Sequence, residues 1–427
     1  MNTDHDGSPG SAPRPQRFPA LAHRDFRALW LGMLVASTTF AFQYYAQMWL
    51  IYSLTDSALV LGVLGAVRGL AMLGFGLWGG ALADRMDRRV LLMVTETLAL
   101  GIAFALGMLA IGGAIDLWLA FGLIFVGAAV GSVDAPIRQA LIPELVPPEH
   151  IPNAVALTTA AQVGSFALTP VLAGFVIDRL GPGGAYLAST IGNVAVLVAL
   201  LSLHYRGRST PERREPVWVT IRGGFSYVGH HAEIRWIVAV LFTTSALGMA
   251  LYNGLIVKWA SEILGLEPGP YGLLAAVWGV GTLVVSYGLS YVGEIRHRGR
   301  IFLWGSLVFG LSFALFGFSR GLALAGFAYL INGAAWAGAS IASAAIVQTR
   351  VPNEVRGRVM SLLTINQAIA QLNGIALGGA AVVVGIEVVF PVSTLLCSAA
   401  VAVLMVAVPT LRRLLRDDES SEAPAGS

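Results

Sequence analysis

Long apolar stretches recur along this chain, and short polar loops separate them. An α-helix needs about 20 mostly apolar residues to cross the hydrocarbon core of a bilayer. Twelve stretches of this kind predict spans at 27–52, 58–82, 89–111, 117–137, 153–178, 184–204, 233–258, 270–292, 300–319, 322–347, 358–383 and 387–410. An even number of crossings returns the chain to its starting side, so both termini are expected on the same face of the membrane.

The charges between these stretches indicate the orientation. Arginine-rich loops occur at 85–89, 206–214, 296–300 and 350–358, and arginines also flank the first and last spans. The opposite loops contain little basic charge beyond Arg179, Lys258 and Arg320. Because basic loops stay in the cytoplasm, both termini are predicted to be cytoplasmic in a multi-pass protein of the cell membrane. The basic pI of 9.1 therefore needs no nucleic-acid partner.

The composition supports the bilayer as the solvent. Of the 427 residues, 56% are hydrophobic and 12% are charged, whereas a soluble domain has about 25% charged residues. With one cysteine, Cys397, and scattered histidines, neither a disulfide nor a metal site is expected. The chain contains no phosphate-binding loop and no hydrolase motif. We therefore predict an all-α membrane protein that is not an enzyme and uses no cofactor or nucleotide.

The chain aligns with itself at a shift of 209 residues. The loop Gln139–Val146 then meets Gln348–Val355, and Arg85–Arg89 meets Glu294–Arg298. Chance matching of short loops is the alternative, but several loops agree at one shift. We predict two pseudo-symmetric six-helix halves, which is typical of transporters with parallel repeats. The expected segments are a disordered tail 1–23, a first half 24–204, a linker 205–232, a second half 233–412 and a disordered tail 413–427.

The loop after the second span carries a recognisable motif. It contains Gly80, Asp84, Arg85, Arg88 and Arg89, and it resembles the loop motif of the major facilitator superfamily, with an aspartate in place of the second glycine. This resemblance implies the major facilitator fold and a monomeric secondary transporter that works by alternating access. It also implies a cytoplasmic gate, in which the acid lies near the eleventh span and the arginines bind the end of the fourth. The alternative is simple anchoring by basic residues, which would need no acid.

Further segments narrow the resemblance. The stretches 138–147 and 351–361 are similar to the enterobactin-exporter-like and macrolide-efflux-like branch of that superfamily, which implies a proton antiporter. In the fifth span, Pro170 and Gly174 match part of an antiporter motif, although ordinary small-residue packing also explains them. An arginine that proton-coupled relatives often carry in the fourth span is missing from 121–133.

Charged residues inside the predicted spans are functional candidates, because charge is costly in a bilayer. Arg68 either attracts an anionic substrate group or locks helix packing. Glu96 is either a proton carrier or the partner of the arginine-rich loop. Asp134, with Arg138 one turn later, is expected to pair with a loop arginine at the gate. Lys258 and Glu262, which are four residues apart, are expected to form an exposed ion pair.

Polar and aromatic stripes predict the wall of a substrate cavity. Amide side chains in lipid must face protein or water, so these positions serve either the cavity or hydrogen bonds between helices. The candidates are Gln43, Tyr44, Gln47, Gln162, Trp278, Asn332, Trp336, Gln367 and Gln371. Their mixture suits an amphipathic organic molecule better than an ion or a sugar.

These observations favour a secondary transporter for proton-coupled efflux of amphipathic molecules, such as a drug, a macrolide or a siderophore-like compound. Its expected partners are the lipid bilayer, a small-molecule substrate and protons. Two alternatives stay open: an importer of a small organic solute, and a non-transporting membrane receptor or scaffold with a transporter fold.

Overall fold

The computed structural model describes residues 18–83, 86–204, 217–292 and 297–416. Within these ranges the regular elements are helical, as predicted. The α-helices are α1 (Arg24–Thr55), α2 (Ala58–Ala83), α3 (Arg88–Ile111), α4 (Leu117–Leu145), α5 (Ile151–Leu201), α6 (Val217–His230), α7 (Ala232–Thr244), α8 (Ala250–Tyr252), α9 (Leu255–Leu264), α10 (Pro268–Val292), α11 (Arg298–Phe318), α12 (Leu322–Arg350), α13 (Asn353–Val384), α14 (Ile386–Ala407) and α15 (Pro409–Arg416). A π-helical turn, Ser245–Met249, joins α7 to α8, and 3-10 turns lie at Pro19–Ala22 and Pro148–His150.

Ten helices in the described ranges are long and apolar enough to cross a membrane. The 51-residue α5 counts as one of them, although it breaks at Gly181, whose φ of 69° lies in the left-handed region that favours glycine. The 32-residue α1 is not among the ten, because threonines and glutamines interrupt its apolar sequence. Length and hydropathy thus give ten candidate spans, fewer than the twelve that we predicted from the sequence.

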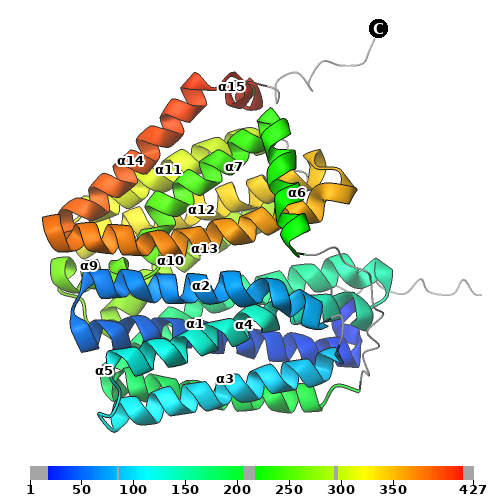
Figure 1. Cartoon of the computed structure of the whole chain (residues 1–427), viewed down its shortest axis with the longest axis vertical. Coiled ribbons are helices and arrows are strands. Elements are labelled where there is room, and N and C mark those ends of the chain that lie inside the picture. Colours follow the sequence, from blue (N-terminus) through cyan, green and yellow to red (C-terminus); the bar gives the residue numbers. More distant parts are fainter. Residues whose placement is uncertain (1–17, 84–85, 205–216, 293–296, 417–427) are drawn as a thin grey trace, which may run out of the picture.

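The helices form two groups that lie one above the other (Figure 1). The first group comprises α1–α5 and the second comprises α6–α15. One hydrophobic core joins both groups at the end of the molecule where α1 leads into α2, which we call the Asp56 end. At the opposite end, where α3 begins, each group has a separate core. We call this the Arg88 end. The two groups are therefore packed together most extensively near the Asp56 end.

Small residues bring the two groups into close contact. A Cβ atom built on Gly62 of α2 would lie 2.1 Å from the carbonyl oxygen of Gly374 in α13. A Cβ atom on Gly272 of α10 would lie 2.2 Å from the carbonyl oxygen of Pro170 in α5. No real side chain tolerates such distances to backbone, so glycine is needed for this close approach of helices. The pairs α2–α13 and α5–α10 thus form the two seams between the groups.

Three details differ from the sequence expectations. The repeat segment 139–146 is not a loop, because α4 continues through Pro136 and Pro143 to Leu145. Part of the expected linker, Val217–His230, is the helix α6. The predicted span 233–258 contains a π-helical turn and a break before α9, at Gly254. There the missing Cβ leaves room for the backbone of Leu61 in the other group.

Candidate functional site

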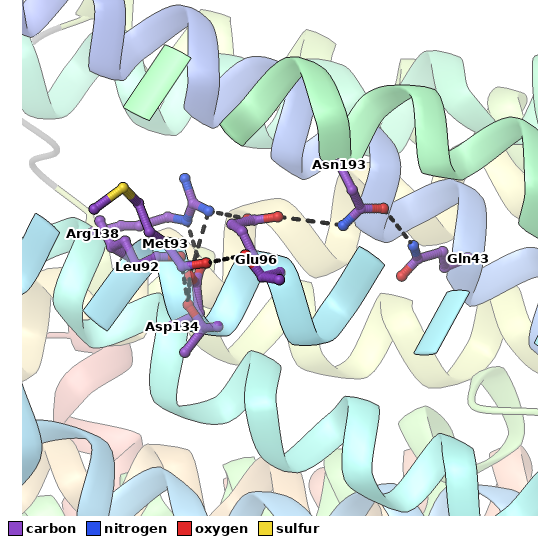
Figure 2. Close-up of polar contacts among 9 residues, drawn as sticks. Gln43, Leu92, Met93, Glu96, Asp134, Arg138 and Asn193 are labelled. Atoms are coloured by element: carbon purple, nitrogen blue, oxygen red, sulfur yellow. Dashed lines mark hydrogen bonds and ion pairs between the residues drawn. The ribbon is translucent and has the colours of Figure 1, made fainter. Parts of the chain in front are cut away.

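A network of charged side chains lies inside the first group (Figure 2). The Arg138 guanidinium on α4 is bound by two carboxylates, Glu96 of α3 and Asp134 one turn earlier on α4. Arg138 is 5% exposed and Glu96 is 7% exposed. Thr95 donates a hydrogen bond of 2.8 Å to the other oxygen of Asp134. Two acids therefore bind one buried cation, and one of them, Asp134, is partly exposed.

Amide side chains extend this network toward the middle of the group. The Asn193 amide, on the second part of α5, donates to Glu96 Oε2 at 3.3 Å. Gln43 of α1 donates in turn to Asn193 Oδ1 and to the Ser189 hydroxyl, both at 3.1 Å. Figure 2 shows this line of polar groups from Arg138 to Gln43. A continuous set of hydrogen bonds thus connects α1 and α5 to the charged cluster on α3 and α4.

The local sequence explains how the cluster forms. Asp134 and Arg138 are four residues apart, so they lie on one face of α4 and can meet. Glu96 is the ninth residue of α3, about 12 Å from its start at 1.5 Å per residue. When both carboxylates are ionised, the trio carries one excess negative charge, which a low-dielectric site disfavours. Uptake of one proton removes that charge, so the arrangement is chemically suited to binding and releasing a proton.

Arg138 is the residue that our sequence analysis left without a role. We ended the predicted fourth span at residue 137. We looked for the arginine of proton-coupled relatives only between residues 121 and 133 of that span. In the structure Arg138 is well inside α4 and buried. Glu96 pairs with Arg138, and among the described residues it forms no ion pair with Arg88 or Arg89. The spacing of Asp134 and Arg138 was the signal in the sequence that could have identified this pair.

Arg68 of α2 lies in a different environment. Its guanidinium carbon is 4.3 Å from the centroid of the Tyr44 ring, which is a cation–π distance. No carboxylate pairs with it in the part of the chain that the structure describes, and its buried Nη1 atom has no hydrogen-bond partner. The alternative in which Arg68 locks helix packing by pairing with a carbonyl or a carboxylate therefore finds no carboxylate among the described residues.

The aromatic cavity candidates lie near Arg68 and along the junction of the two groups. Tyr44 donates a 3.1 Å hydrogen bond to Asn253 of the second group, and its ring is stacked with that of Tyr252. The rings of Tyr252, Trp278 and Trp336 follow one another at centroid distances of 5.3 Å. Together they form an aromatic surface that begins at Arg68 and continues into the second group.

The remaining cavity candidates have varied surroundings. Asn332 is fully buried and accepts a 3.1 Å hydrogen bond from Trp278, so both residues join helices within the second group. Gln162 and Gln367 are exposed. Gln47 and Gln371 are partly buried, and the Oε1 atom of each is buried without a hydrogen-bond partner. The predicted set therefore does not form one continuous cluster.

The predicted gate motif is only partly within the described residues. Asp84 and Arg85 lie outside them, and Gly80 belongs to the last turn and a half of α2. Arg88 binds Glu144 and the carbonyl oxygen of Ala140 near the end of α4.

The start of α3 completes this end of the first group. Arg89 donates to the carbonyl oxygens of Leu200 and Leu201 at the end of α5. The side chain of Asp87, which replaces the usual glycine of the motif, caps α3 by accepting from the backbone N–H groups of Arg89 and Val90. The basic residues at the start of α3 thus bind the ends of two neighbouring helices.

Pro170 and Gly174, which match part of the antiporter motif in the predicted fifth span, lie at the α5–α10 seam between the groups. A Cβ atom built on Gly174 would lie 2.4 Å from the carbonyl oxygen of Pro268, at the start of α10. Pro170 is buried, and its carbonyl oxygen faces Gly272 of α10. In this structure both residues serve close helix packing.

Polar contacts also join the groups at the Asp56 end. Lys258 of α9 donates a 2.7 Å hydrogen bond to the backbone carbonyl of Asp56 and pairs with its carboxylate at 3.1 Å. It also pairs with Glu262, as the sequence predicted. Nearby, Tyr52 donates to the Ser261 hydroxyl at 3.1 Å. The lysine therefore binds both groups, which the sequence alone did not indicate.

Comparison with known proteins places these features in context. Residues 16–426 match the model of a family described as transmembrane secretion effector. The staphyloferrin A transporter of Staphylococcus aureus is 24% identical, over 81% of this chain and 86% of that protein. The enterobactin exporter EntS of Citrobacter koseri is 26% identical, over 84% of this chain and 85% of that protein. A solved POT family peptide transporter superposes with a TM-score of 0.72 at 13% identity, covering 91% of this chain and 96% of that one.

Proposed function

Because this chain belongs to the transmembrane secretion effector family of the major facilitator superfamily, we propose that it exports amphipathic organic small molecules in exchange for protons. Membrane transport follows from the family. Export as the direction is supported by the relatives, one of which is named an enterobactin exporter. The other is named a staphyloferrin A transporter, so siderophore-like molecules are among the substrates to test.

The proposed architecture has twelve spans in two six-helix halves. It counts α1 as a span and α5 as two spans that meet at Gly181. Two contacts between the groups support the repeat. Tyr44 binds Asn253 and Tyr52 binds Ser261, and each pair is separated by 209 residues. Positions equivalent in two halves meet each other near a twofold axis, so these pairs fit a pseudo-twofold axis between α1 and the segment α8–α9.

We place the Arg88 end in the cytoplasm, because described residues of the arginine-rich loops, such as Arg89 and Arg298, lie at that end. With this orientation both termini are cytoplasmic. The shared core and the Lys258 contacts then close the outer side, while the separate cores let the groups part on the inner side. The exposed amides of Gln162 and Gln367 are consistent with a water-filled opening there. The structure would correspond to a state closed toward the outside.

The observation that carries the proposed proton coupling is the trio of Glu96, Asp134 and Arg138, in which Glu96 and Arg138 are buried. Buried ionisable groups in a membrane are costly and mark ion pathways. We propose that one of the two acids takes up a proton and loosens its bond to Arg138. Arg138 links α3 to α4, and so proton binding would change how these helices hold together. Arg88 at the end of α4 would respond as part of the cytoplasmic gate.

The experiment that tests this proposal is transport by cells that overproduce the protein. A panel of fluorescent dyes, labelled macrolides and catecholate compounds is loaded, and accumulation is followed with and without an uncoupler. We expect the wild type to lower accumulation of at least one compound, and the uncoupler to abolish that effect. Glu96→Gln and Asp134→Asn should lose uncoupler-sensitive transport of the same compound.

Glu149→Gln is the matched control. It makes the same glutamate-to-glutamine change as Glu96→Gln, but at an exposed residue at the same end of the molecule. It should transport like the wild type. Transport by Glu96→Gln and Asp134→Asn that is still abolished by the uncoupler would refute the role of the trio. Higher accumulation in cells with the wild-type protein would show import instead of export.

A further inference from the structure

Arg68 is the charged residue that the proposed coupling mechanism leaves unused. It lies on α2 beside the seam with α13, and two neighbours on α2 make that seam tight. Cβ atoms built on Gly65 and Gly69 would each lie 3.0 Å from a backbone oxygen of α13. The guanidinium therefore emerges at the place where both groups of helices meet, near the middle of α2.

The polar atoms around Arg68 have unmet hydrogen-bonding capacity. Its Nη1 atom is buried and unpartnered, and so are Oε1 of Gln47 and Oε1 of Gln371. The Cβ atom of Gln371 lies 3.2 Å from a Cβ built on Gly69, next to Arg68 in the chain. The Tyr186 hydroxyl interacts electrostatically with Arg68 and lies close enough to Gln47 to form a hydrogen bond with it. Buried polar atoms in native proteins are almost always satisfied, so such a group of exceptions indicates a missing partner.

An anion is the partner that fits this chemistry. A guanidinium offers a planar set of donors that matches a carboxylate or a similar oxyanion. Tyr44 lies against Arg68 with its ring face, and neither that ring nor a neutral phenol hydroxyl neutralises the charge of the guanidinium. The aromatic surface formed by Tyr44, Tyr252, Trp278 and Trp336 leads away from the guanidinium and suits the apolar part of the same molecule.

We propose that Arg68 is the anchor of a substrate site for organic anions, in which the oxyanion binds Arg68 and a flat apolar part packs on these four rings. The unpartnered amide oxygens accept from hydroxyl or amide groups next to the oxyanion. This inference rests on the proposed transport function, and it narrows the substrate class from amphipathic molecules to amphipathic anions.

Binding to the purified full chain tests the site without any proton gradient. The protein is placed in nanodiscs of phosphatidylcholine, so that no anionic lipid supplies the oxyanion. Two dyes with the same xanthene ring are compared by fluorescence anisotropy after subtraction of empty discs: anionic carboxyfluorescein and cationic rhodamine 6G. We expect saturable binding of carboxyfluorescein that exceeds binding of rhodamine 6G. Addition of anionic lipid to the discs should weaken dye binding only if lipid headgroups also occupy the site.

Variants of Arg68 decide the assignment. Arg68→Gln should weaken carboxyfluorescein binding by about tenfold or more, because it removes a charge-assisted hydrogen bond. Arg68→Lys keeps the charge but not the planar fork and should bind with intermediate affinity. Arg320→Gln is the matched control, since Arg320 hydrogen-bonds to the nearby carbonyl oxygens of Gly317 and Ser319, and it should leave binding unchanged.

Absence of carboxyfluorescein binding by the wild type, or equal binding by Arg68→Gln, would overturn the proposal. Glu96→Gln separates this result from the coupling mechanism. If it binds the anion normally but loses uncoupler-sensitive transport, both ideas stand. If Arg68-dependent binding is present while wild-type cells show no transport, the transport proposal fails and the site remains.

Discussion

The α3–α4 pair of the first group and the α11–α12 pair of the second are related by the 209-residue shift, yet their interiors differ. Glu96, Asp134 and Arg138 hold the first pair together through charge. The positions 209 residues later are Gly305, Ser343 and Val347. Val347 is fully buried in an apolar core, and a Cβ on Gly305 would lie 3.1 Å from the backbone of α12. One pair is joined by ions and the other by close apolar packing.

This difference indicates which part of the molecule is built to change. Apolar packing of the kind seen in α11–α12 is stable and insensitive to protons. A buried ion cluster contributes little net stability, because desolvation offsets the attraction between the charges. At the three related positions α11–α12 is joined without buried charge, so the packing of two such helices does not in itself require it. The contrast supports our proposal that coupling is located in the first group, with the second group as a more rigid counterpart.

The largest effect is expected from removing the cation alone. Arg138→Met leaves two carboxylates in a buried site without their partner, and we expect it to lower the free energy of unfolding by about 3–5 kcal/mol. Unfolding of the purified protein in sodium dodecyl sulfate, followed by circular dichroism, measures this. The control is Val347→Met at the related position, which keeps an apolar residue. Equal stability of Arg138→Met and the wild type would contradict the interpretation of the cluster.

Removing the whole cluster should have a different result. A triple variant with Glu96→Leu, Asp134→Leu and Arg138→Met makes α3–α4 resemble α11–α12. We expect its stability to return to within about 2 kcal/mol of the wild type, because apolar replacement of a complete ion cluster is often neutral or stabilising. Uncoupler-sensitive transport should nevertheless be lost. A triple variant as unstable as Arg138→Met would show that the ions are required for folding.

Glycine substitutions sharpen the contrast in packing. Gly281→Ala, in α10 of the second group, would place a Cβ 2.1 Å from the carbonyl oxygen of Leu330 in α12, and we expect a loss of about 1–3 kcal/mol. Gly127→Ala, in α4 of the first group, meets only Ile102 at an ordinary 3.6 Å. It should be neutral or stabilising by up to about 1 kcal/mol, because alanine favours helices. The same denaturation assay reports both, and similar losses in the two variants would refute the difference in packing.

The sequence predicted the class of fold because apolar runs of spanning length are a strong signal. It also predicted that Arg68, Glu96 and Asp134 lie inside the apolar spans. It missed Arg138 as part of the site, because the predicted fourth span ended at residue 137, whereas α4 contains two prolines, Pro136 and Pro143, of a residue type that often ends a helix. In the structure the helix continues through both, which carries Arg138 into the interior.

Other parts of the site depend on tertiary packing and have no local signal. Nothing in the spacing of residues shows that Glu96 faces Arg138 from another helix, or that Asn193 reaches Glu96. Lys258 and Glu262 were predicted as a pair because they are four residues apart on one helix. The contact of Lys258 with Asp56 joins residues separated by 202 positions, so only the three-dimensional structure reveals it.

The smallest expected effect concerns this contact, where the charge that links the two groups is near the surface. Lys258→Gln breaks the pair with Asp56, whereas Glu262→Gln breaks only the pair inside the second group and serves as the control. Near-surface ion pairs contribute about 0–1 kcal/mol, so opening of the Asp56 end should rise by up to about fivefold.

The rate at which a membrane-impermeant maleimide labels Leu61→Cys, in a Cys397→Ser background, measures that opening, because Leu61 is fully buried between the groups. If Lys258→Gln is labelled faster than the wild type and Glu262→Gln is labelled at the wild-type rate, the contact of Lys258 with Asp56 restrains the separation of the two groups. Equal rates in all three proteins would leave apolar packing and the glycine seams as the only restraint on opening.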